Sequence, residues 1–337
     1  MSELKEFDLL NEQNLLTKAG MKTQFEIQSD AVKALYTNPD LIVPTEQDEI
    51  VYRHNWEGKR YYYSNIDIPN ITNKDLYPSV TTIESEVLAD SCFLKKWMVD
   101  SFDNIQEYHN YMKEKADYGT FMHTTFEQFL VHNYFPNTEQ LEFDIKTYMD
   151  ANSITSIHPK SWITPITKAL ISFDRFLVEK KVTPIAVELP LISKTMGYAG
   201  ALDLVCQLEF NRKTIPCIID FKSGASWDSH PIQLKAYKDL YNEKHNHIDH
   251  IFNWHPNDWA KPTGSLYKLI NQTDSPKCAE WKPLLELYKL KEEPFKPKMI
   301  FNGQLTRNMD IEDIIVYVTP QDEVRQKFSI RDMEESV

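Results

Sequence analysis

Two aspartates and a lysine, Asp203, Asp220 and Lys222, lie near the ends of apolar segments and could together perform metal-dependent chemistry. Residues 217–224 read Cys-Ile-Ile-Asp-Phe-Lys-Ser-Gly, an apolar run that favours a β-strand. Because side chains alternate between the two faces of a strand, Asp220 and Lys222 are expected on the same face. The alternative interpretation is a surface ion pair of little energy, since Asp-x-Lys alone is a common pattern.

The preceding apolar segment, residues 197–205, contains a single carboxylate, Asp203. We expect it to be half-buried, which costs free energy unless the group is paired or binds a metal. A hairpin between the two segments would bring Asp203 beside Asp220, and a divalent cation would relieve their repulsion. Mg²⁺ is usually held by one or two carboxylates, with water and substrate phosphate completing its shell. The alternative is one buried aspartate that accepts backbone N–H groups.

Two more candidate ligands come from other segments. Glu188 lies between apolar neighbours and could bind or orient a ligand, or could equally be an exposed residue on the solvated face of a strand. His123 and Glu127 share one face of a predicted helix. The imidazole could complete a metal shell at the sheet edge, although a lone helical histidine is more often structural. Glu127 is expected behind the ligands or at the surface.

Polar residues at two predicted helices could contact a phosphate group. Gln233 and Tyr237 are four residues apart, so an amide and a hydroxyl would share one helix face. The alternative is an amphipathic helix whose polar residues are incidental. Ser79, Thr81 and Thr82 stand at a predicted helix N-terminus, where backbone N–H groups attract anions. Plain helix capping explains these three residues equally well.

A sheet must position these side chains. The order of periodic segments predicts an α/β fold with a mixed sheet. The predicted core elements are a helix at 163–181, strands at 185–191, 198–208 and 215–221, a helix opened by Ser229 and reaching 241, and strands at 250–254 and 265–271. Further helices are predicted near 79–88, 93–98 and 118–130, and a hairpin at 50–63. Residues 1–48 are predicted as helix plus irregular arm.

Composition narrows the function classes. With 337 residues and 42% hydrophobic content, the chain can bury a substantial core. A net charge of −13 counts against a passive DNA-coating protein, but less against an enzyme that meets its substrate in one local groove. No CxxC pair occurs among the four cysteines, so no zinc site is expected. The polar N-terminus and the lack of a long apolar run predict a soluble, cytoplasmic protein with no membrane association.

Taken in order, the motifs resemble those of the PD-(D/E)XK nuclease superfamily, and more closely its RecB-like exonuclease branch. The matching residues are Gly119/His123/Glu127, Glu188, Gly200 with Asp203, Asp220-Phe221-Lys222, and Gln233/Tyr237. Residues 77–83, 95–97 and 252–256 are also similar to the mitochondrial genome-maintenance exonucleases and their phage-encoded relatives. Each motif alone is weak, but five in the right order are specific. The resemblance covers residues 76–275.

This resemblance implies a restriction-endonuclease-like core over residues 76–275, with a central mixed β-sheet flanked by helices. A partly helical N-terminal arm and hairpin would occupy residues 1–75, and a C-terminal extension would occupy residues 276–337. The implied activity is metal-dependent hydrolysis of DNA, at ends or in single strands, in replication, recombination or repair. If the protein is viral, its compartment would be the host cytoplasm.

The resemblance also assigns roles. It implies that His123, Asp203, Asp220 and the backbone carbonyl of Phe221 bind Mg²⁺ or Mn²⁺. Lys222 would position the attacking water or stabilise the transition state, with Glu188 as a further catalytic carboxylate. Gln233 and Tyr237 would hold the substrate phosphate, with a second contact from the predicted helix N-terminus. Only one cysteine, Cys278, follows the core, so no iron–sulfur cluster is expected.

Two alternatives stay open. A non-catalytic DNA-binding or interaction module could keep this fold, although the retained acids and lysine argue against decay. A site-specific or structure-specific endonuclease of the same superfamily is the other, and the histidine and Gln/Tyr motifs favour the exonuclease. In the 50–63 hairpin, three tyrosines and Trp56 beside Arg53, Lys59 and Arg60 could stack on single-stranded DNA. The favoured interpretation is a hydrophobic face docked on the core.

Overall fold

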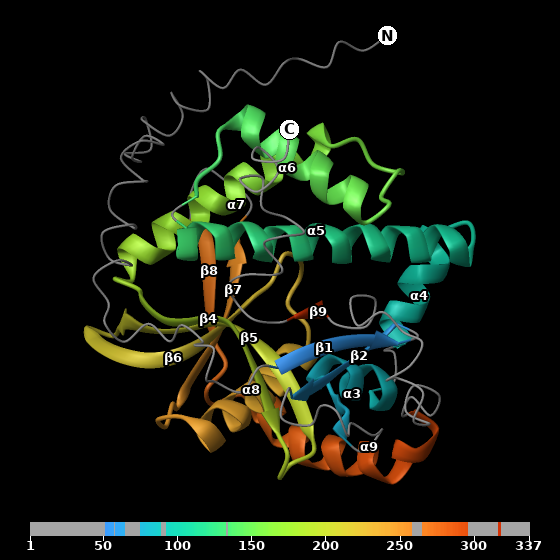
Figure 1. The fold of residues 1–337 in the computed structure, drawn as a ribbon, viewed down its shortest axis with the longest axis vertical. Helices are drawn as coiled ribbons and strands as arrows, with labels where there is room; N and C mark the ends of the chain where they lie inside the picture. Colours follow the sequence, from blue (N-terminus) through green and yellow to red (C-terminus); the bar gives the residue numbers. More distant parts are fainter. Residues whose placement is uncertain are drawn as a thin grey trace.

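The computed structural model describes residues 51–56, 58–64, 75–88, 92–132, 134–257, 265–295 and 316–317. These residues form two β-sheets with helices packed around the larger one (Figure 1). None of the helices in these ranges combines the length and apolar character that a membrane crossing needs. The predicted helical arm at 1–48 lies outside the described residues, as does most of the C-terminal extension.

The larger sheet has five strands in the order β4-β5-β6-β7-β8. These strands are β4 (Thr183–Ser193), β5 (Tyr198–Phe210), β6 (Lys213–Phe221), β7 (His250–Pro256) and β8 (Tyr267–Asn271). Neighbouring strands are antiparallel except β6 and β7, which are parallel and joined by α8 (Ser229–Lys244). A parallel pair requires such a crossover. The predicted α/β fold with a mixed sheet is confirmed.

Helices cover both faces of this sheet (Figure 1). One face packs against α5 (Ile105–His132) and α7 (Lys160–Glu179), with α6 (Thr138–Ala151) packed on α7, through an aromatic core that includes Phe126, Phe173 and Trp254. The other face packs against α8, α3 (Val80–Val87) and α9 (Trp281–Phe295), with the short 3₁₀ helix η3 (Pro276–Glu280) beside them. Helix α4 (Cys92–Ser101) precedes α5.

The smaller sheet has the order β3-β2-β1-β9. Its strands are β1 (Val51–Trp56), β2 (Lys59–Ser64), β3 (Tyr77–Pro78) and β9 (Val316–Tyr317). The predicted hairpin is confirmed as β1 and β2. It packs on the larger sheet where Val51 and Tyr62 meet Ile192 and Ala199. A bridge between Ser79 and Ala199 joins the two sheets directly.

Some predicted boundaries were wrong. Helix α5 begins at Ile105 rather than near Tyr118, because its first turns are polar and exposed and show no apolar period. Helices α6 and α9 were not predicted, although Leu141, Ile145 and Tyr148 of α6 have helical spacing and are buried. The N-cap of α8 is Asp228 rather than Ser229, and its side chain makes no capping hydrogen bond.

Candidate metal centre and active site

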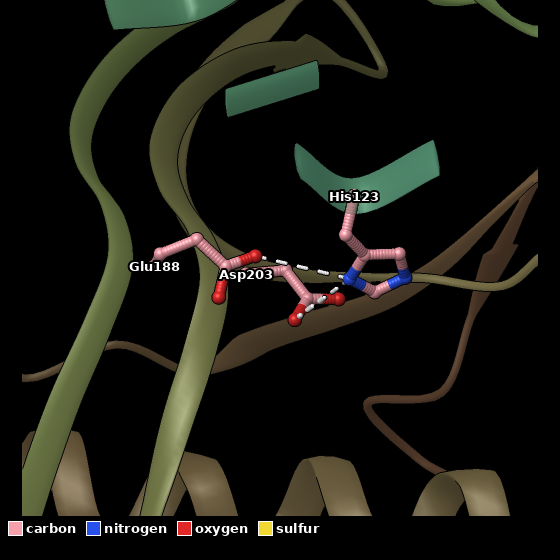
Figure 2. Close-up of side chains that lie close together, drawn as sticks. All are labelled: His123, Glu188 and Asp203. Carbon is pink, nitrogen blue, oxygen red and sulfur yellow. Dashed lines mark ion pairs between the residues drawn. The ribbon is translucent and has the colours of Figure 1, made fainter. Parts of the chain in front are cut away.

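Three potential metal ligands converge from three separate elements (Figure 2). His123 comes from α5, Glu188 from β4 and Asp203 from β5. The Nδ1 atom of His123 lies 3.5 Å from Asp203 Oδ1 and 3.8 Å from Glu188 Oε1, and one ligand atom from each residue lies within 4.8 Å of the others. An imidazole nitrogen and two carboxylate oxygens are a donor set that fits a divalent cation. These residues could hold a metal ion.

The backbone of β4 is irregular at Glu188, which has a left-handed φ of 48°. The other described non-glycine residues with positive φ lie at turns, whereas Glu188 lies inside a strand. Side-chain alternation also breaks there. Val187 packs with the α5–α7 core, but Leu189, two residues on, packs with the α3–α8–α9 core. Such a conformation costs on the order of 1–3 kcal/mol and is typical of functional sites.

Strand β5 has a matching switch at Asp203. Leu202 and Leu204 are two residues apart, yet they pack in opposite cores. They pair with Leu189 and Val187 respectively, so Glu188 and Asp203 stand at the same level of neighbouring strands. The two carboxylates therefore meet where both strands change faces.

The end of β6 orients both His123 and Asp203. His123 Nε2 lies 3.0 Å from the carbonyl oxygen of Phe221, and the backbone N–H of Phe221 donates to Asp203 Oδ2 at 2.6 Å. A carbonyl oxygen can only accept, so Nε2 carries a proton and donates it. The nitrogen that faces the carboxylates is then Nδ1, which is the ligand atom of the neutral ring.

Burial and neighbouring charges shift the pKa of all three members of this cluster. Burial favours neutral His123, but the carboxylates of Asp203 and Glu188 outweigh it and hold the pKa of His123 well above its usual value. Burial raises the pKa of Glu188, partly offset by a hydrogen bond from His123. Burial also opposes ionisation of Asp203, yet His123, Lys222 and the N–H of Phe221 together lower the pKa of Asp203. A bound cation would replace the proton on His123.

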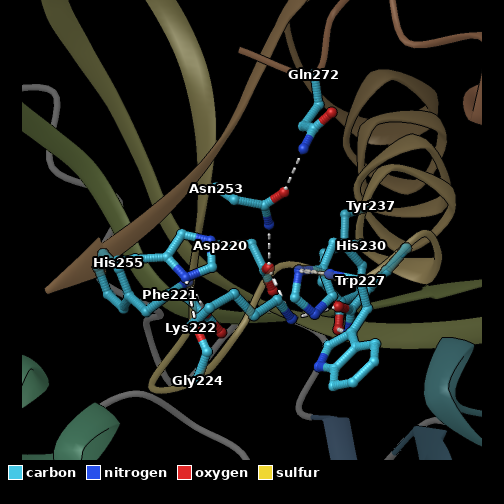
Figure 3. A network of polar contacts seen from close by, with 12 residues as sticks. Asp220, Phe221, Lys222, Gly224, Trp227, His230, Tyr237, Asn253, His255 and Gln272 are labelled. Carbon is cyan, nitrogen blue, oxygen red and sulfur yellow. Dashed lines mark hydrogen bonds and ion pairs between the residues drawn. The ribbon is translucent and has the colours of Figure 1, made fainter. Parts of the chain in front are cut away.

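A second network begins at Asp220, whose carboxylate is buried (Figure 3). Asp220 Oδ2 lies 2.8 Å from Lys222 Nζ and accepts a 2.7 Å hydrogen bond from the side-chain amide of Asn253. Gln272 in turn donates to Asn253 at 3.0 Å. Burial raises the pKa of Asp220 to about 6, offset by Lys222 and reinforced by repulsion from Asp203. The predicted placement of Asp220 and Lys222 on one face of β6 is confirmed.

The α8 residues Gln233 and Tyr237 continue this network. Lys222 donates to Gln233 Oε1 at 2.6 Å, and Gln233 Nε2 donates to the Tyr237 hydroxyl at 2.9 Å. The Tyr237 ring packs against the backbone of Gly200, where a Cβ atom would lie 2.7 Å from the ring. Gln233 therefore holds the lysine, and α8 is pressed onto β5 at a point where only glycine fits.

The structure brings most predicted site residues together but groups them differently. Glu188, rather than Asp220, completes the cluster with His123 and Asp203. Asp220 Oδ2 is engaged by Lys222 and Asn253, and the Phe221 carbonyl by His123. Metal binding by Asp220 and Phe221 stays a prediction. Glu127, one turn after His123, is buried rather than at the surface.

The residues predicted at the helix N-terminus act as a cap. Ser79 is the N-cap of α3 and accepts the backbone N–H of Thr82 at 3.0 Å. The Thr82 hydroxyl donates to the Arg60 carbonyl at 3.0 Å and accepts from the Arg60 N–H at 2.8 Å, which ties α3 to β2. Ser79 and Thr82 are buried, and Thr81 is exposed. The capping interpretation is confirmed, and phosphate binding here stays a prediction.

The tyrosines of the hairpin are buried rather than available for stacking. Tyr61, Tyr62 and Tyr63 are each at most 5% exposed, which confirms the docked interpretation. The side chain of Trp56 lies outside the described residues. Among the basic residues of the hairpin, Arg60 is exposed, and Arg53 and Lys59 are half-buried.

Sequence inspection missed Glu84 of α3. Burial raises the pKa of Glu84 to about 8, an effect that Lys222 opposes and Asp220 reinforces. Its Oε1 atom is buried and has no hydrogen-bond partner. A sequence signal existed, because Glu84 interrupts the apolar stripe of Val80, Ile83 and Val87. Asn253, inside an apolar strand, is a second missed residue.

Comparisons with known proteins do not assign this site. No family model matches the chain, and no curated protein matches it. The chemistry must therefore be inferred from the site itself. A candidate cation site lies beside a hydrogen-bonded acid–lysine pair.

Proposed function

We propose that this protein is a metal-dependent nuclease with a restriction-endonuclease-like core, and that it hydrolyses phosphodiester bonds of DNA from an end. The observation that carries the proposal is the placement of Asp220 and Lys222 directly beside the His123–Glu188–Asp203 cluster. Phosphodiester hydrolysis needs a cation to neutralise charge on the phosphate and an ordered group near the attacking water. The residues that could meet both requirements come from neighbouring strands of one sheet and from α5.

In this proposal His123, Glu188 and Asp203 hold Mg²⁺ or Mn²⁺. A bound ion would supply Lewis acidity and lower the pKa of a bound water. Asp220 and Gln233 fix the Lys222 ammonium from two sides, at 2.8 Å and 2.6 Å. Lys222 positions the attacking water or stabilises charge on the phosphate. Because Asp220 and Gln233 already hold its ammonium group, the side chain does not have to be ordered during the reaction.

The geometry refines the expected role of the Gln/Tyr pair. Gln233 accepts from Lys222 and donates to Tyr237, so its amide is already used within the protein. We therefore assign Gln233 as a positioning residue for Lys222. A direct phosphate contact by the Tyr237 hydroxyl is compatible with this assignment, because a hydroxyl that accepts one hydrogen bond can still donate one.

The test compares cleavage of linear DNA labelled at the 5′ or the 3′ end with cleavage of a closed circle. Each substrate is incubated with Mg²⁺, with Mn²⁺ and with EDTA. The variants are Asp203→Asn, Asp220→Asn and Lys222→Met. Lys213→Met is the matched control, because Lys213 is an exposed lysine on the same strand, far from the site.

We expect metal-dependent loss of the labelled end in the wild type and in Lys213→Met. The three site variants should be slower by about a hundredfold or more. Cleavage in EDTA, or full activity of Asp220→Asn and Lys222→Met, contradicts the proposal. Cleavage of the circle would instead indicate an endonuclease. DNA binding without any cleavage would favour a non-catalytic module.

A further inference from the structure

The β1–β2 hairpin carries two arginines on one of its faces. In the antiparallel register Arg53 pairs with Tyr62 and Asn55 pairs with Arg60. Because directly paired residues share a face and alternate residues do too, Arg53, Arg60 and Tyr62 point to the same side. The same face includes Val51, which is buried.

That face is turned toward the larger sheet. Val51 and Tyr62 pack against Ile192 of β4 and Ala199 of β5, so the hairpin lies across the strands that carry Glu188 and Asp203. The two arginines extend from this contact. Because Arg53 and Arg60 share the face that packs on β4 and β5, they lie on the side of the hairpin that is turned toward Glu188, whose negative charge favours the charged form of both guanidinium groups. The hairpin therefore places two positive charges on the side of β4 and β5 that faces it, and these two strands carry Glu188 and Asp203.

Neither arginine forms an ion pair within the described part of the protein. No carboxylate of the described residues lies within ion-pair distance of either guanidinium, and the Arg53 Nε atom is buried without a hydrogen-bond partner. A buried N–H of a charged group without a partner is costly, and a ligand that supplies an acceptor would remove this cost. Arg60 lies two residues before Tyr62 on the same face of β2, and its guanidinium carries five N–H donors.

The ligand chemistry follows from the donors and from the charge. A guanidinium presents a fixed fork of N–H groups that matches the oxygens of a phosphate. The chain as a whole carries −13, so an anionic strand needs local cations where it meets the protein. Two arginines next to a cation site meet this need.

We propose that Arg53 and Arg60 bind a backbone phosphate of the DNA strand, next to the phosphate that is cleaved, on the hairpin side of the metal centre. This inference rests on the proposed nuclease function. It assigns the hairpin to substrate binding through its arginines, not through its aromatic rings.

The test measures binding without cleavage. A short single-stranded oligonucleotide with a fluorescent 3′ end is titrated with protein in Ca²⁺, in an Asp220→Asn background, and anisotropy is recorded. The variants are Arg53→Gln and Arg60→Gln. Arg212→Gln is the matched control, since Arg212 is an exposed arginine in the β5–β6 turn. Thermal melting of each variant confirms that it is folded, and Arg60→Lys tests whether charge alone suffices.

We expect each hairpin variant to bind about tenfold more weakly than Arg212→Gln. The slope of log affinity against log salt should also fall by about 0.7 for each arginine removed. Arg60→Lys should recover only part of the affinity, because an ammonium lacks the planar fork.

A methylphosphonate scan locates the contact. One phosphate at a time is replaced by a neutral methylphosphonate, and the affinity of each oligonucleotide is measured. At one position, the neutral linkage should weaken binding by the Asp220→Asn protein. The same linkage should not weaken binding further when Arg60→Gln is also present, because that variant has already lost the contact between the arginine and this phosphate. Equal binding by the hairpin variants and Arg212→Gln, or additive effects at every position, would overturn the proposal.

The outcomes separate this inference from the proposed function. Arginine-dependent binding by a wild-type protein that cleaves nothing would overturn the nuclease proposal alone. Normal cleavage with unchanged binding in both hairpin variants would overturn the arginine proposal alone. If the protein binds no oligonucleotide at all, the arginine proposal fails as well.

Discussion

The imidazole of His123 lies 3.0 Å from the backbone carbonyl of Phe221, measured at Nε2, and its Nδ1 faces the two carboxylates of the candidate metal centre. Phe221 thus fixes which histidine nitrogen is available to a cation, and it does so with a main-chain atom. The same residue donates its N–H to Asp203. One peptide segment at the end of β6 therefore orients two candidate ligands at once.

Metal binding should depend on pH through His123. The carboxylates hold the pKa of His123 well above its usual value, and a cation can bind only after this proton leaves. Affinity for Mn²⁺ should therefore fall as the pH is lowered from about 8 to about 6. Isothermal titration calorimetry in buffers of different ionisation enthalpy measures both the affinity and the proton release.

Variants of the ligands provide the control for this pH dependence. Glu188→Gln and His123→Ala should each weaken Mn²⁺ binding by about tenfold or more, and His123→Ala should also reduce the proton release. Equal Mn²⁺ affinity in the wild type and in both variants would exclude this cluster as the metal centre.

The free energy of unfolding should fall with rising pH because of Glu84. Its pKa is about 8 in the folded protein, against an ordinary value of 4.5. Between these values the folded state keeps a proton that the unfolded state releases, so each rise in pH favours unfolding. The effect approaches about 1.4 kcal/mol for each unit of pKa difference and is complete above the folded pKa.

Glu84→Gln isolates this contribution. The variant cannot ionise, so its stability relative to the wild type should increase from about pH 5 to about pH 8. Urea denaturation in EDTA at several pH values measures the difference. Asp144, whose pKa burial raises to about 7, contributes a slope of the same sign to both proteins and cancels. A constant difference between the two proteins would show that Glu84 ionises normally.

Gln233 should affect turnover more than substrate binding. Because it holds Lys222 at 2.6 Å, Gln233→Ala should lower kcat by about tenfold and leave KM nearly unchanged. A residue that held the phosphate in the ground state would instead raise KM. Steady-state kinetics on an end-labelled duplex distinguishes the two roles, with Gln207→Ala as a control in which an exposed glutamine of β5 is replaced.

The left-handed conformation of Glu188 should make this residue a site of stored strain. Glycine adopts a φ of 48° without steric cost, so Glu188→Gly should stabilise the metal-free protein by roughly 1 kcal/mol while weakening metal binding. Glu188→Gln keeps a side chain with a Cβ atom, so it should not relieve the backbone strain at this position. Denaturation of both variants in EDTA measures this, and a less stable Glu188→Gly would show that the conformation is not strained.

The order of strands β4 to β8 and of helix α8 could be predicted from the sequence, because the strands are apolar runs separated by turn residues and by this one helix. The placement of Asp220 beside Lys222 followed from the period of a strand alone. The irregularity at Glu188 could not be predicted, because its left-handed backbone is imposed by two strands that change faces together. If side chains along β4 alternated regularly between the two faces, Glu188 would still be interpreted as a residue on the solvated face.

Glu84 and Asn253 were missed in the sequence for the same physical reason. Asn253 hydrogen-bonds to Asp220 and Gln272, and Glu84 responds to the charges of Lys222 and Asp220, all on other elements of the chain. Local patterns mark Glu84 and Asn253 only as polar residues inside apolar stretches. The separation of the candidate metal centre from the Asp220 network also could not be predicted from the sequence. It depends on which oxygen atoms Lys222, Asn253 and His123 engage, and these distances are set by packing in three dimensions.

Gly200 carries no reactive group, yet it begins a series of contacts that ends at Lys222. Any side chain at this position would displace the Tyr237 ring, which is hydrogen-bonded to Gln233, which in turn holds Lys222. The positions of an active site that tolerate mutation poorly are expected to be those with reactive side chains. At Gly200 tolerance to mutation would depend on the space available as well: a saturation screen should find that Gly200 on β5 tolerates replacement as poorly as Lys222, the residue that follows β6.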